Sequence, residues 1–158
     1  LSGGLASGRS CLAVIPGGTS MRVVPGDQML SAEMSYEGME AVGSAIGSGG
    51  VIVMDDRTDL AEALAVMMQF YQHESCGQCT PCREGSGWVS TLADRLAQGL
   101  GRSGDVDRLY TVAQQIEGRT ICAFGEAISW PVSSFIKHFR SQLEAGIAPA
   151  NQAVEDGQ

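Results

Sequence analysis

The sequence has little positive charge and no long apolar segment. Its 158 residues include 10 Lys and Arg against 18 Asp and Glu, which gives a formal net charge of −8. Because a nucleic-acid-binding protein needs a basic face to neutralise phosphates, this balance argues against nucleic acid as a partner. No apolar run approaches the roughly 20 residues of a membrane-spanning helix, so we expect no direct membrane span. No charged segment precedes an apolar stretch after Leu1, so we expect no signal peptide.

Glycine, by contrast, is abundant in the first third of the chain. More than half of the 21 glycines lie within residues 1–50. Hydrophobic residues make up 44% of the chain and charged residues 18%, which is typical of a globular protein rather than a disordered one. The chain opens at Leu1 and not at a methionine, and we interpret it as a fragment of a longer protein.

Residues 1–57 have the pattern of short strands separated by glycine-rich turns. Apolar runs at residues 11–15 and 21–24 each end at a Pro-Gly pair, which predicts two strands closed by turns. Apolar residues at helical spacing predict a short helix within residues 36–46, and a β-branched run predicts a strand at residues 51–54.

Residues 58–145 have the spacing of four amphipathic helices. Their short connections favour a small four-helix bundle, followed by a flexible tail at residues 146–158. We expect Ser103 to cap the third helix, Gly118 to end it, and Pro131 to begin the fourth. The expected core stripes, which include both tryptophans, are Leu60, Leu64, Met67, Met68 and Tyr71; Trp88, Leu92 and Leu96; Val106, Leu109, Ala113 and Ile116; and Trp130, Val132, Phe135, Ile136, Phe139 and Leu143.

Five cysteines carry the clearest chemical signal. Cys76, Cys79 and Cys82 form a C-x2-C-x2-C run, and Cys122 follows much later in the chain. Three thiolates on one loop and a fourth from a distant segment suit a [4Fe–4S] cluster, because the run is a known iron–sulfur ligand pattern. A tetrahedral zinc site more often takes its ligands as two separated pairs, and disulfides are typical of secreted chains; both stay open as alternatives.

The fourth ligand is either Cys11 or Cys122. Cys11 opens an apolar strand, where a free cysteine usually acts as a small core residue. Cys122 lies between the third and fourth predicted helices, and in a short bundle that connection is at the same end as the cysteine loop between the first two. We therefore predict that the metal ligands are Cys76, Cys79, Cys82 and Cys122.

The residues beside the cysteine run suit an anionic group. We expect Thr80 to cap the second helix and Pro81 to begin it, so that Cys82 lies in the first turn. Free N–H groups and the positive end of the helix dipole would then face the cluster. Arg83 either adds a positive charge nearby or is a solvated helix residue.

Other candidate residues carry weaker signals. We expect His73 to end a helix, His138 to lie at the surface, and Glu74 and Glu84 to face solvent or a partner. The glycines at 43–50 follow a helix and precede a strand, the reverse of the order in a dinucleotide-binding unit, so we interpret them as a helix stop and a turn. No Ser/His/Asp or paired-carboxylate set stands out, so we predict no catalytic residue.

Several of these motifs resemble the NADH-binding flavoprotein subunit of respiratory complex I and the related diaphorase subunits of NAD-reducing hydrogenases and NAD-dependent formate dehydrogenases. The resemblance implies an α+β fold, in which a partial β-grasp-like (soluble-ligand-binding) segment at residues 1–57 precedes a small four-helix bundle carrying a [4Fe–4S] cluster. The similar stretches are residues 74–85, which read Glu-Ser-Cys-Gly-Gln-Cys-Thr-Pro-Cys-Arg-Glu-Gly, residues 118–123 and 130–140, and upstream residues 13–18 and 43–55.

The resemblance also implies a function. In this family NADH reduces a bound FMN, and the cluster takes electrons singly from the flavin; the resemblance thus implies an electron-transfer module of an NADH:quinone oxidoreductase. The implied partners are an upstream flavin domain and the other subunits of a multisubunit NADH dehydrogenase on the inner, cytoplasmic side of a membrane. We find no FMN or NADH domain in this chain and transfer no residue for those cofactors. The alternatives are the same module of a formate dehydrogenase or hydrogenase diaphorase, and a zinc-stabilised structural or docking module.

Overall fold

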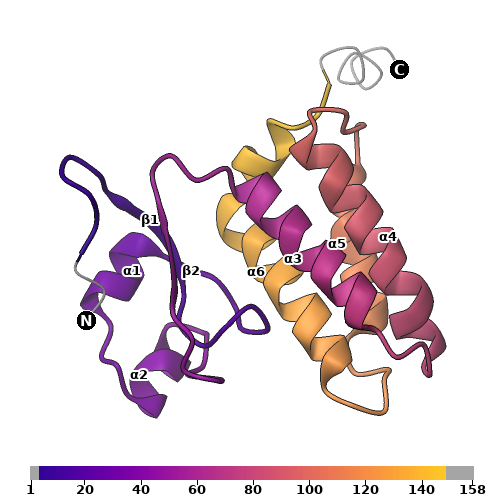
Figure 1. Ribbon diagram of the computed structural model, residues 1–158, viewed down its shortest axis with the longest axis horizontal. Helices are drawn as coiled ribbons and strands as arrows, with labels where there is room; N and C mark the ends of the chain where they lie inside the picture. The colour runs from indigo at the N-terminus through magenta and orange to yellow at the C-terminus, as the bar shows by residue number, and fades with distance from the viewer. Residues whose placement is uncertain (1–3, 149–158) are drawn as a thin grey trace. The chain divides into compact units, whose positions relative to one another are not determined.

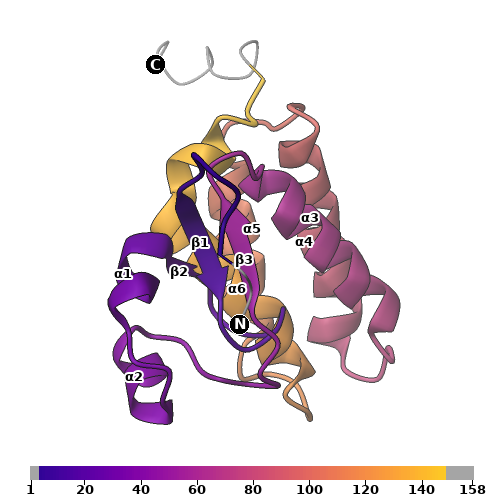
Figure 2. The ribbon, with the colours of Figure 1, turned by 60° about the vertical axis from the view of Figure 1, so that its left-hand side comes forward.

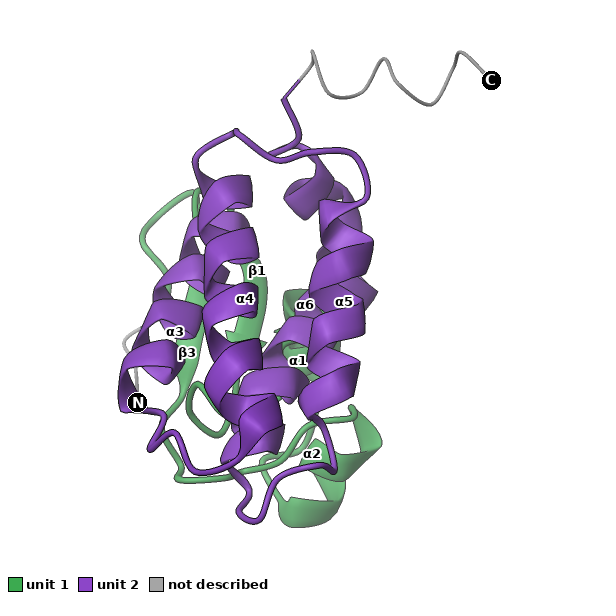
Figure 3. Ribbon diagram, turned by 90° about the vertical axis from the view of Figure 1, so that its right-hand side faces the viewer, with its two compact units in different colours: residues 1–58 green, residues 59–158 purple. Residues whose placement is uncertain are grey.

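The computed structural model describes residues 4–148 and separates the chain into two compact units, Leu1–Thr58 and Asp59–Gln158 (Figure 3). In the part of the chain that is described, the first unit combines a small sheet with short helices, and the second consists of longer helices. The mixed α and β composition predicted from the sequence is confirmed. None of the described helices is both long and apolar enough to cross a membrane.

The first unit is built on a three-stranded antiparallel sheet (Figure 2). Its elements are β1 (Cys11–Ile15), β2 (Val24–Pro25), α1 (Gly26–Ser31), α2 (Tyr36–Ala41) and β3 (Ile52–Asp55). The strand order is β2-β1-β3, because Val14 pairs with Val24 on one side and with Val53 on the other. The strand predicted at residues 11–15 is confirmed, and the strand predicted at 51–54 is confirmed with a shift of one residue.

The other predictions for this unit are only partly right. Of the strand predicted at residues 21–24, only Val24 pairs, and the predicted turn that follows is the start of α1. Gly26 fits at this start because a Cβ on it would lie 2.1 Å from the carbonyl oxygen of Cys11. The helix α2 is shorter than predicted, since Gly43 adopts a φ of +76° that ends it.

The second unit contains α3 (Leu60–Glu74), α4 (Thr80–Ala97), α5 (Asp105–Ile116) and α6 (Phe124–Glu144). Both α3 and α5 pack against α4 and α6, and α4 also packs against α6. The α3–α4 and α5–α6 connections lie at one end of this unit, and the α4–α5 connection lies at the other (Figure 1). This topology brings two segments that are far apart in the sequence to the same end.

The buried faces confirm three of the four predicted stripes. On α3, α5 and α6 the predicted positions are buried, apart from the half-buried Trp130. On α4 the prediction holds only for Leu96, because Trp88 is 60% exposed and Leu92 is half-buried. A Cβ on Gly85 would lie 2.7 Å from the side chain of Ile116, so α4 approaches α5 closely at this small residue, while Trp88 borders the cavities between the two helices. The apolar core positions of α4 are Val89, Ala93 and Leu96.

Several helix ends differ from the predictions. The helix α6 begins at Phe124, so Pro131 lies inside the helix and not in its first turn. An interior proline removes one N–H donor and its ring crowds the carbonyl one turn earlier, yet the helix continues through Pro131. The N-cap residue of α5 is Gly104, with a φ of +76°, and not Ser103. Gly118, with a φ of +69°, follows the end of α5 as predicted.

The first residues of the predicted tail are held by backbone hydrogen bonds. The N–H of Gly101 donates to the carbonyl of Gly146 (2.9 Å), and the N–H of Ala148 donates to the carbonyl of Gly101 (3.0 Å). A Cβ on Gly146 would lie 2.1 Å from the carbonyl oxygen of Leu96, so a glycine is needed at this contact. The rest of the predicted tail, residues 149–158, lies outside the described residues.

Candidate metal centre

Three cysteines lie at the α3–α4 connection. Cys76 is exposed, Cys79 is half-buried and Cys82 is buried. The N-cap residue of α4 is Cys79, so the predicted Thr80 cap is wrong by one position. The helical ladder starts earlier than predicted because the N–H of Arg83 donates to the carbonyl of Cys79 (2.8 Å). Cys82 lies in the first turn, as predicted, where N–H groups without intrahelical partners and the helix dipole favour negative charge.

Arg83 braces the loop that carries these cysteines. Its Nη1 donates to the carbonyl of Gly77 (3.1 Å), and its Nε donates to Oε1 of Glu84 (2.9 Å). Gly77 has a φ of +76°, a conformation that an L side chain rarely adopts. Arg83 is therefore tied to the loop backbone, and part of its charge is balanced by a carboxylate.

Cys122 lies in the α5–α6 connection, and a hydrogen bond joins that segment to the cysteine loop. The backbone N–H of Ile121 donates to Sγ of Cys79 (3.4 Å), which links residues 42 positions apart. The hydroxyl of Thr120 donates to the carbonyl of Cys122 (2.8 Å). A Cβ on Gly125 would lie 2.4 Å from Oγ1 of Thr120, so the segment packs closely against the start of α6.

Two further hydrogen bonds anchor the same segment to α6. The N–H of Gly118 donates to Oε1 of Glu126 (3.0 Å), and Nε1 of Trp130 donates to Oε1 of Glu117 (2.9 Å). Both acceptors are carboxylates, which make stronger hydrogen bonds than neutral groups. Hydrogen bonds between the residues that directly follow α5 and the first turns of α6 therefore hold the segment that carries Cys122 in place.

The two segments surround a cavity of about 160 Å³. That volume is roughly ten times the room that a single water needs, so the cavity can hold a group of several atoms. Cys76 and Cys122 are exposed and Cys82 is buried, so the cavity has an open side and a closed side. Within residues 4–148, no three His, Cys, Asp or Glu side chains are grouped as ligands of one metal ion. The lining residues are Glu74, Cys76, Cys79, Cys82, Thr120, Cys122 and Phe124.

Two of the lining sulfur atoms have hydrogen-bond partners in the protein. Oγ of Ser75 lies 3.3 Å from Sγ of Cys82, and the N–H of Ile121 donates to Sγ of Cys79. Such donors stabilise negative charge on a thiolate ligand. Ser75 could not be recognised from the sequence as a hydrogen-bond partner of a ligand, because a serine beside a cysteine run has no distinguishing spacing of its own.

The predictions for the nearby titratable residues hold in part. Glu74, the last residue of α3, is exposed as predicted, and it also lines the cavity. His73 lies in the last turn of α3 with its side chain 86% exposed, and Glu84 is exposed, both as predicted. His138 is half-buried rather than on the surface, and burial together with the charge of Lys137 lowers its pKa.

Cys11 lies in β1 of the first unit and is absent from the lining of this cavity. It is half-buried, and burial raises the pKa of its thiol. A neutral, half-buried cysteine in a strand acts as a small apolar residue, which agrees with the sequence analysis.

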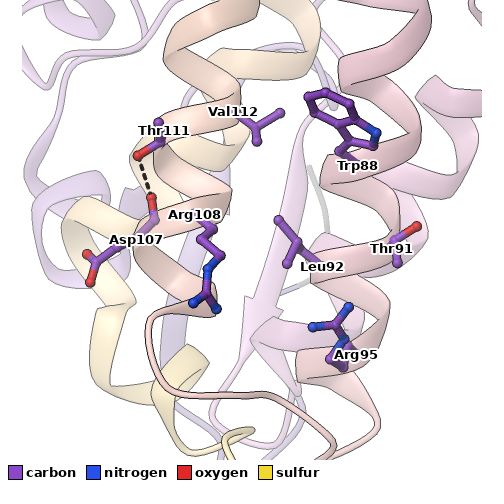
Figure 4. Close-up of a pocket in the computed structure, with 8 residues that line it drawn as sticks. All are labelled: Trp88, Thr91, Leu92, Arg95, Asp107, Arg108, Thr111 and Val112. Atoms are coloured by element: carbon purple, nitrogen blue, oxygen red, sulfur yellow. Dashed lines mark hydrogen bonds between the residues drawn. The ribbon is translucent and has the colours of Figure 1, made fainter. Parts of the chain in front are cut away.

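A second cavity, of about 510 Å³, lies between α4 and α5 (Figure 4). Trp88 and Leu92 project from α4, and Val112 projects from α5 on the opposite side. Arg95 and Arg108 border one end. No cysteine or histidine is among its lining residues, so it has no soft ligand for a metal. The residues that line this second cavity are Trp88, Thr91, Leu92, Arg95, Asp107, Arg108, Thr111 and Val112.

Comparisons with known proteins find similarity to the F subunits of NADH-quinone oxidoreductases. The family model of the NADH-ubiquinone oxidoreductase-F iron-sulfur binding region matches residues 62–146. The chain is 49% identical over 146 residues to an F subunit of the NADH-quinone oxidoreductase of Rhizobium meliloti (strain 1021). It is 46% identical over 147 residues to the F subunit of the NADH-quinone oxidoreductase of Rickettsia bellii (strain OSU 85-389). Each match covers 92% of this chain, which spans about a third of the length of these relatives (34% and 35%).

A solved structure is similar over most of the chain. It is that of an NAD+-reducing [NiFe]-hydrogenase in the H2-reduced state, with a TM-score of 0.77 and 31% sequence identity. The match covers 89% of this chain and 24% of the hydrogenase chain. The likeness therefore includes the arrangement of the elements as well as the sequence.

Proposed function

The chain belongs to the family of the NADH-ubiquinone oxidoreductase-F iron-sulfur binding region, and on this premise we propose that it is the electron-transfer module of an NADH:quinone oxidoreductase. In this proposal the chain receives electrons one at a time from an FMN that NADH reduces, and passes them to further iron–sulfur clusters. FMN and NADH bind in the parent subunit, outside this module. The observation that carries the proposal is the cavity at one end of the helical unit, lined by four cysteines.

We propose that Cys76, Cys79, Cys82 and Cys122 hold a [4Fe–4S] cluster in that cavity. When bound, such a cluster supplies reversible one-electron transfer. The volume of about 160 Å³ supports a group of several atoms. A zinc ion with four sulfur ligands at ~2.3 Å draws the sulfurs around a single atom and needs no cavity of this size.

The protein residues bind the cluster and adjust its surroundings. Cys79 and Cys82 lie at the N-terminus of α4, where the helix dipole favours their negative charge. The N–H of Ile121 stabilises one sulfur, and the buried side of the cavity keeps water from Cys82. The exposed cysteines, Cys76 and Cys122, lie on the open side, where a neighbouring electron carrier can approach.

The finer architecture follows from the same proposal. Residues 1–57 are a partial β-grasp-like segment, and residues 58–145 are a four-helix bundle that carries the cluster. The antiparallel sheet of the first unit and the mutual packing of α3 to α6 support this division. The partners are the upstream flavin domain and the other subunits of the NADH dehydrogenase, which is bound to the inner, cytoplasmic face of a membrane.

Alternatively, the chain is the same module of the diaphorase subunit of an NAD-reducing hydrogenase. The solved hydrogenase, at 31% identity, supports this alternative. The identities of 46% and 49% to the F subunits of NADH-quinone oxidoreductases favour the quinone enzyme.

Metal analysis of anaerobically purified protein tests the proposal. We expect about four irons and about four acid-labile sulfides per chain, and a paramagnetic signal after one-electron reduction. One zinc per chain with no sulfide would show a structural metal domain in place of an electron-transfer module.

A further inference from the structure

We propose that the hydroxyl of Ser75 raises the reduction potential of the cluster by donating a hydrogen bond to Sγ of Cys82. The proposal rests on the proposed function, since it needs the cluster to be bound. Oγ of Ser75 lies 3.3 Å from Sγ of Cys82, and either atom can be the donor while the thiol carries its proton. A thiolate bound to iron has no proton, so in the loaded protein the hydroxyl is the donor.

The other contact of Ser75 leaves its proton available for this bond. The backbone N–H of Gly77 donates to Oγ of Ser75 (3.4 Å), so the loop uses the oxygen as an acceptor. The hydroxyl hydrogen is then directed at the sulfur. In such a chain, from N–H to hydroxyl to thiolate, each hydrogen bond polarises the next and strengthens it.

The burial of Cys82 explains why its sulfur depends on the hydroxyl of Ser75 for a hydrogen bond, whereas the exposed cysteines can use water. Of the four candidate ligands Cys82 alone is buried, with 6% of its surface exposed. Cys76 and Cys122 are exposed and can accept hydrogen bonds from water. The sulfur of Cys82 has little access to water, so the half-buried Ser75 supplies the hydrogen bond that solvent does not.

Thr120 provides a natural contrast in the same cavity. It lines the cavity as well, but its hydroxyl donates to the carbonyl of Cys122 (2.8 Å) and not to a sulfur. Removal of the Thr120 hydroxyl changes the polarity of the cavity and deletes a hydrogen bond to the backbone of Cys122, but none to a ligand sulfur. Ser75 and Thr120 are therefore a matched pair.

The direction of the effect follows from charge. A one-electron reduction takes the cluster and its four thiolates from a net charge of about −2 to about −3. A hydrogen bond to sulfur strengthens as the negative charge grows, because charge-assisted bonds are roughly twice as strong as neutral ones. Loss of the hydroxyl should lower the equilibrium constant for reduction about three- to tenfold, which is about 30–60 mV at ~59 mV per decade.

The test is a redox titration of the loaded chain with dithionite as the one-electron reductant, followed by electron paramagnetic resonance. We expect Ser75→Ala to lower the midpoint potential at unchanged iron and sulfide content. Ser75→Thr, which keeps a hydroxyl, should restore it, and Thr120→Val, which removes a cavity hydroxyl that bonds no sulfur, should lower it less than Ser75→Ala does. In resonance Raman spectra, the iron–sulfur stretching bands of the unaltered chain should shift in D2O, and part of that shift should be missing in Ser75→Ala.

The outcomes separate this proposal from the function on which it rests. A fully loaded Ser75→Ala chain with an unchanged potential overturns the proposal and leaves the proposed function intact. Equal drops in Ser75→Ala and Thr120→Val also overturn it, because general cavity polarity then explains both. If Ser75→Ala assembles no cluster, the resonance Raman spectrum of the unaltered chain provides the test. If its iron–sulfur stretching bands do not shift in D2O, the proposal is overturned. A chain that takes up no iron overturns the proposed function as well.

Discussion

Replacement of the buried Asp105 by alanine should destabilise the protein by about 2–4 kcal/mol. Its side chain is 1% exposed and accepts three hydrogen bonds. The donors are the N–H of Arg102 (2.9 Å), Nη1 of Arg95 (3.0 Å) and Nη1 of Arg108 (2.8 Å). The backbone N–H contributes ~1 kcal/mol, and the partly buried Arg95 contributes ~1–2 kcal/mol. The pair with Arg108, whose side chain is 61% exposed, is reduced by solvent screening to ~0–1 kcal/mol.

Equilibrium unfolding in urea near neutral pH measures this loss, with Asp107→Ala as the matched control. Asp107 lies on the same helix and pairs with Arg140, but its side chain is 71% exposed. We expect the control to lose less than about 1 kcal/mol, because exposed ion pairs contribute little. If Asp105→Ala lost no more than the control, the argument that burial makes this carboxylate important would be refuted.

The carboxylate of Asp105 should also make the stability of the protein depend on pH, with a loss of stability in acid. Burial opposes the charged form of Asp105, but the hydrogen bonds from the three arginines outweigh it, so the pKa lies below its usual range. Because the folded pKa is below the unfolded value of about 3.9, the stabilisation is complete above that value and is lost as the pH falls through the folded pKa. The stability difference between the unaltered chain and Asp105→Ala should therefore stay constant above about pH 5 and shrink below about pH 4. A difference that grows on acidification would contradict this sign.

The remaining predictions concern the cysteine ligands and two glycines. Cys11→Ser should keep its iron and sulfide, whereas Cys122→Ser should lose the cluster or retain a three-iron form; metal analysis with the opposite pattern would overturn the ligand assignment. Gly125→Ala should lower the iron content and destabilise the protein by about 1–3 kcal/mol, because the new Cβ would lie 2.4 Å from Oγ1 of Thr120. Unchanged iron content and urea stability would show that this close contact does not hold the segment. Gly87→Ala, where the nearest atom to the new Cβ is 3.6 Å away, should raise the free energy of unfolding by ~0.5–1 kcal/mol, and a loss in urea would contradict this.

Features that depend on the residues of a single segment could be predicted without knowledge of the elements that pack against it. An apolar stripe with a period of 3.6 residues is a local property, so the buried faces of α3, α5 and α6 were predictable. The spacing of Cys76, Cys79 and Cys82 is local too, and it points to a metal or cluster in any fold that keeps the loop together. Gly118 ends α5 because its positive φ requires no partner beyond the helix itself.

The errors arise where a distant contact overrides a local pattern. Trp88 fits an apolar stripe, yet its side chain is 60% exposed beside the cavity between α4 and α5, and the close approach of α4 to Ile116 is at Gly85. Pro131 resembles a helix start, yet the contacts of Glu126 and Trp130 with the preceding segment favour a helix that begins earlier. In both cases the deciding neighbour lies on another element.

The helical unit, the cysteine loop and the kind of group that such a loop binds could all be predicted from the order of the residues. The surroundings of the sulfur atoms could not, because they depend on contacts between distant segments. The tertiary structure brings the N–H of Ile121 to Cys79, places Ser75 beside Cys82 and puts Glu74 at the rim of the cavity. These placements depend on how α3, α4 and α6 pack at one end of the unit, and distances between packed elements are not encoded in the spacing of residues along any one of them.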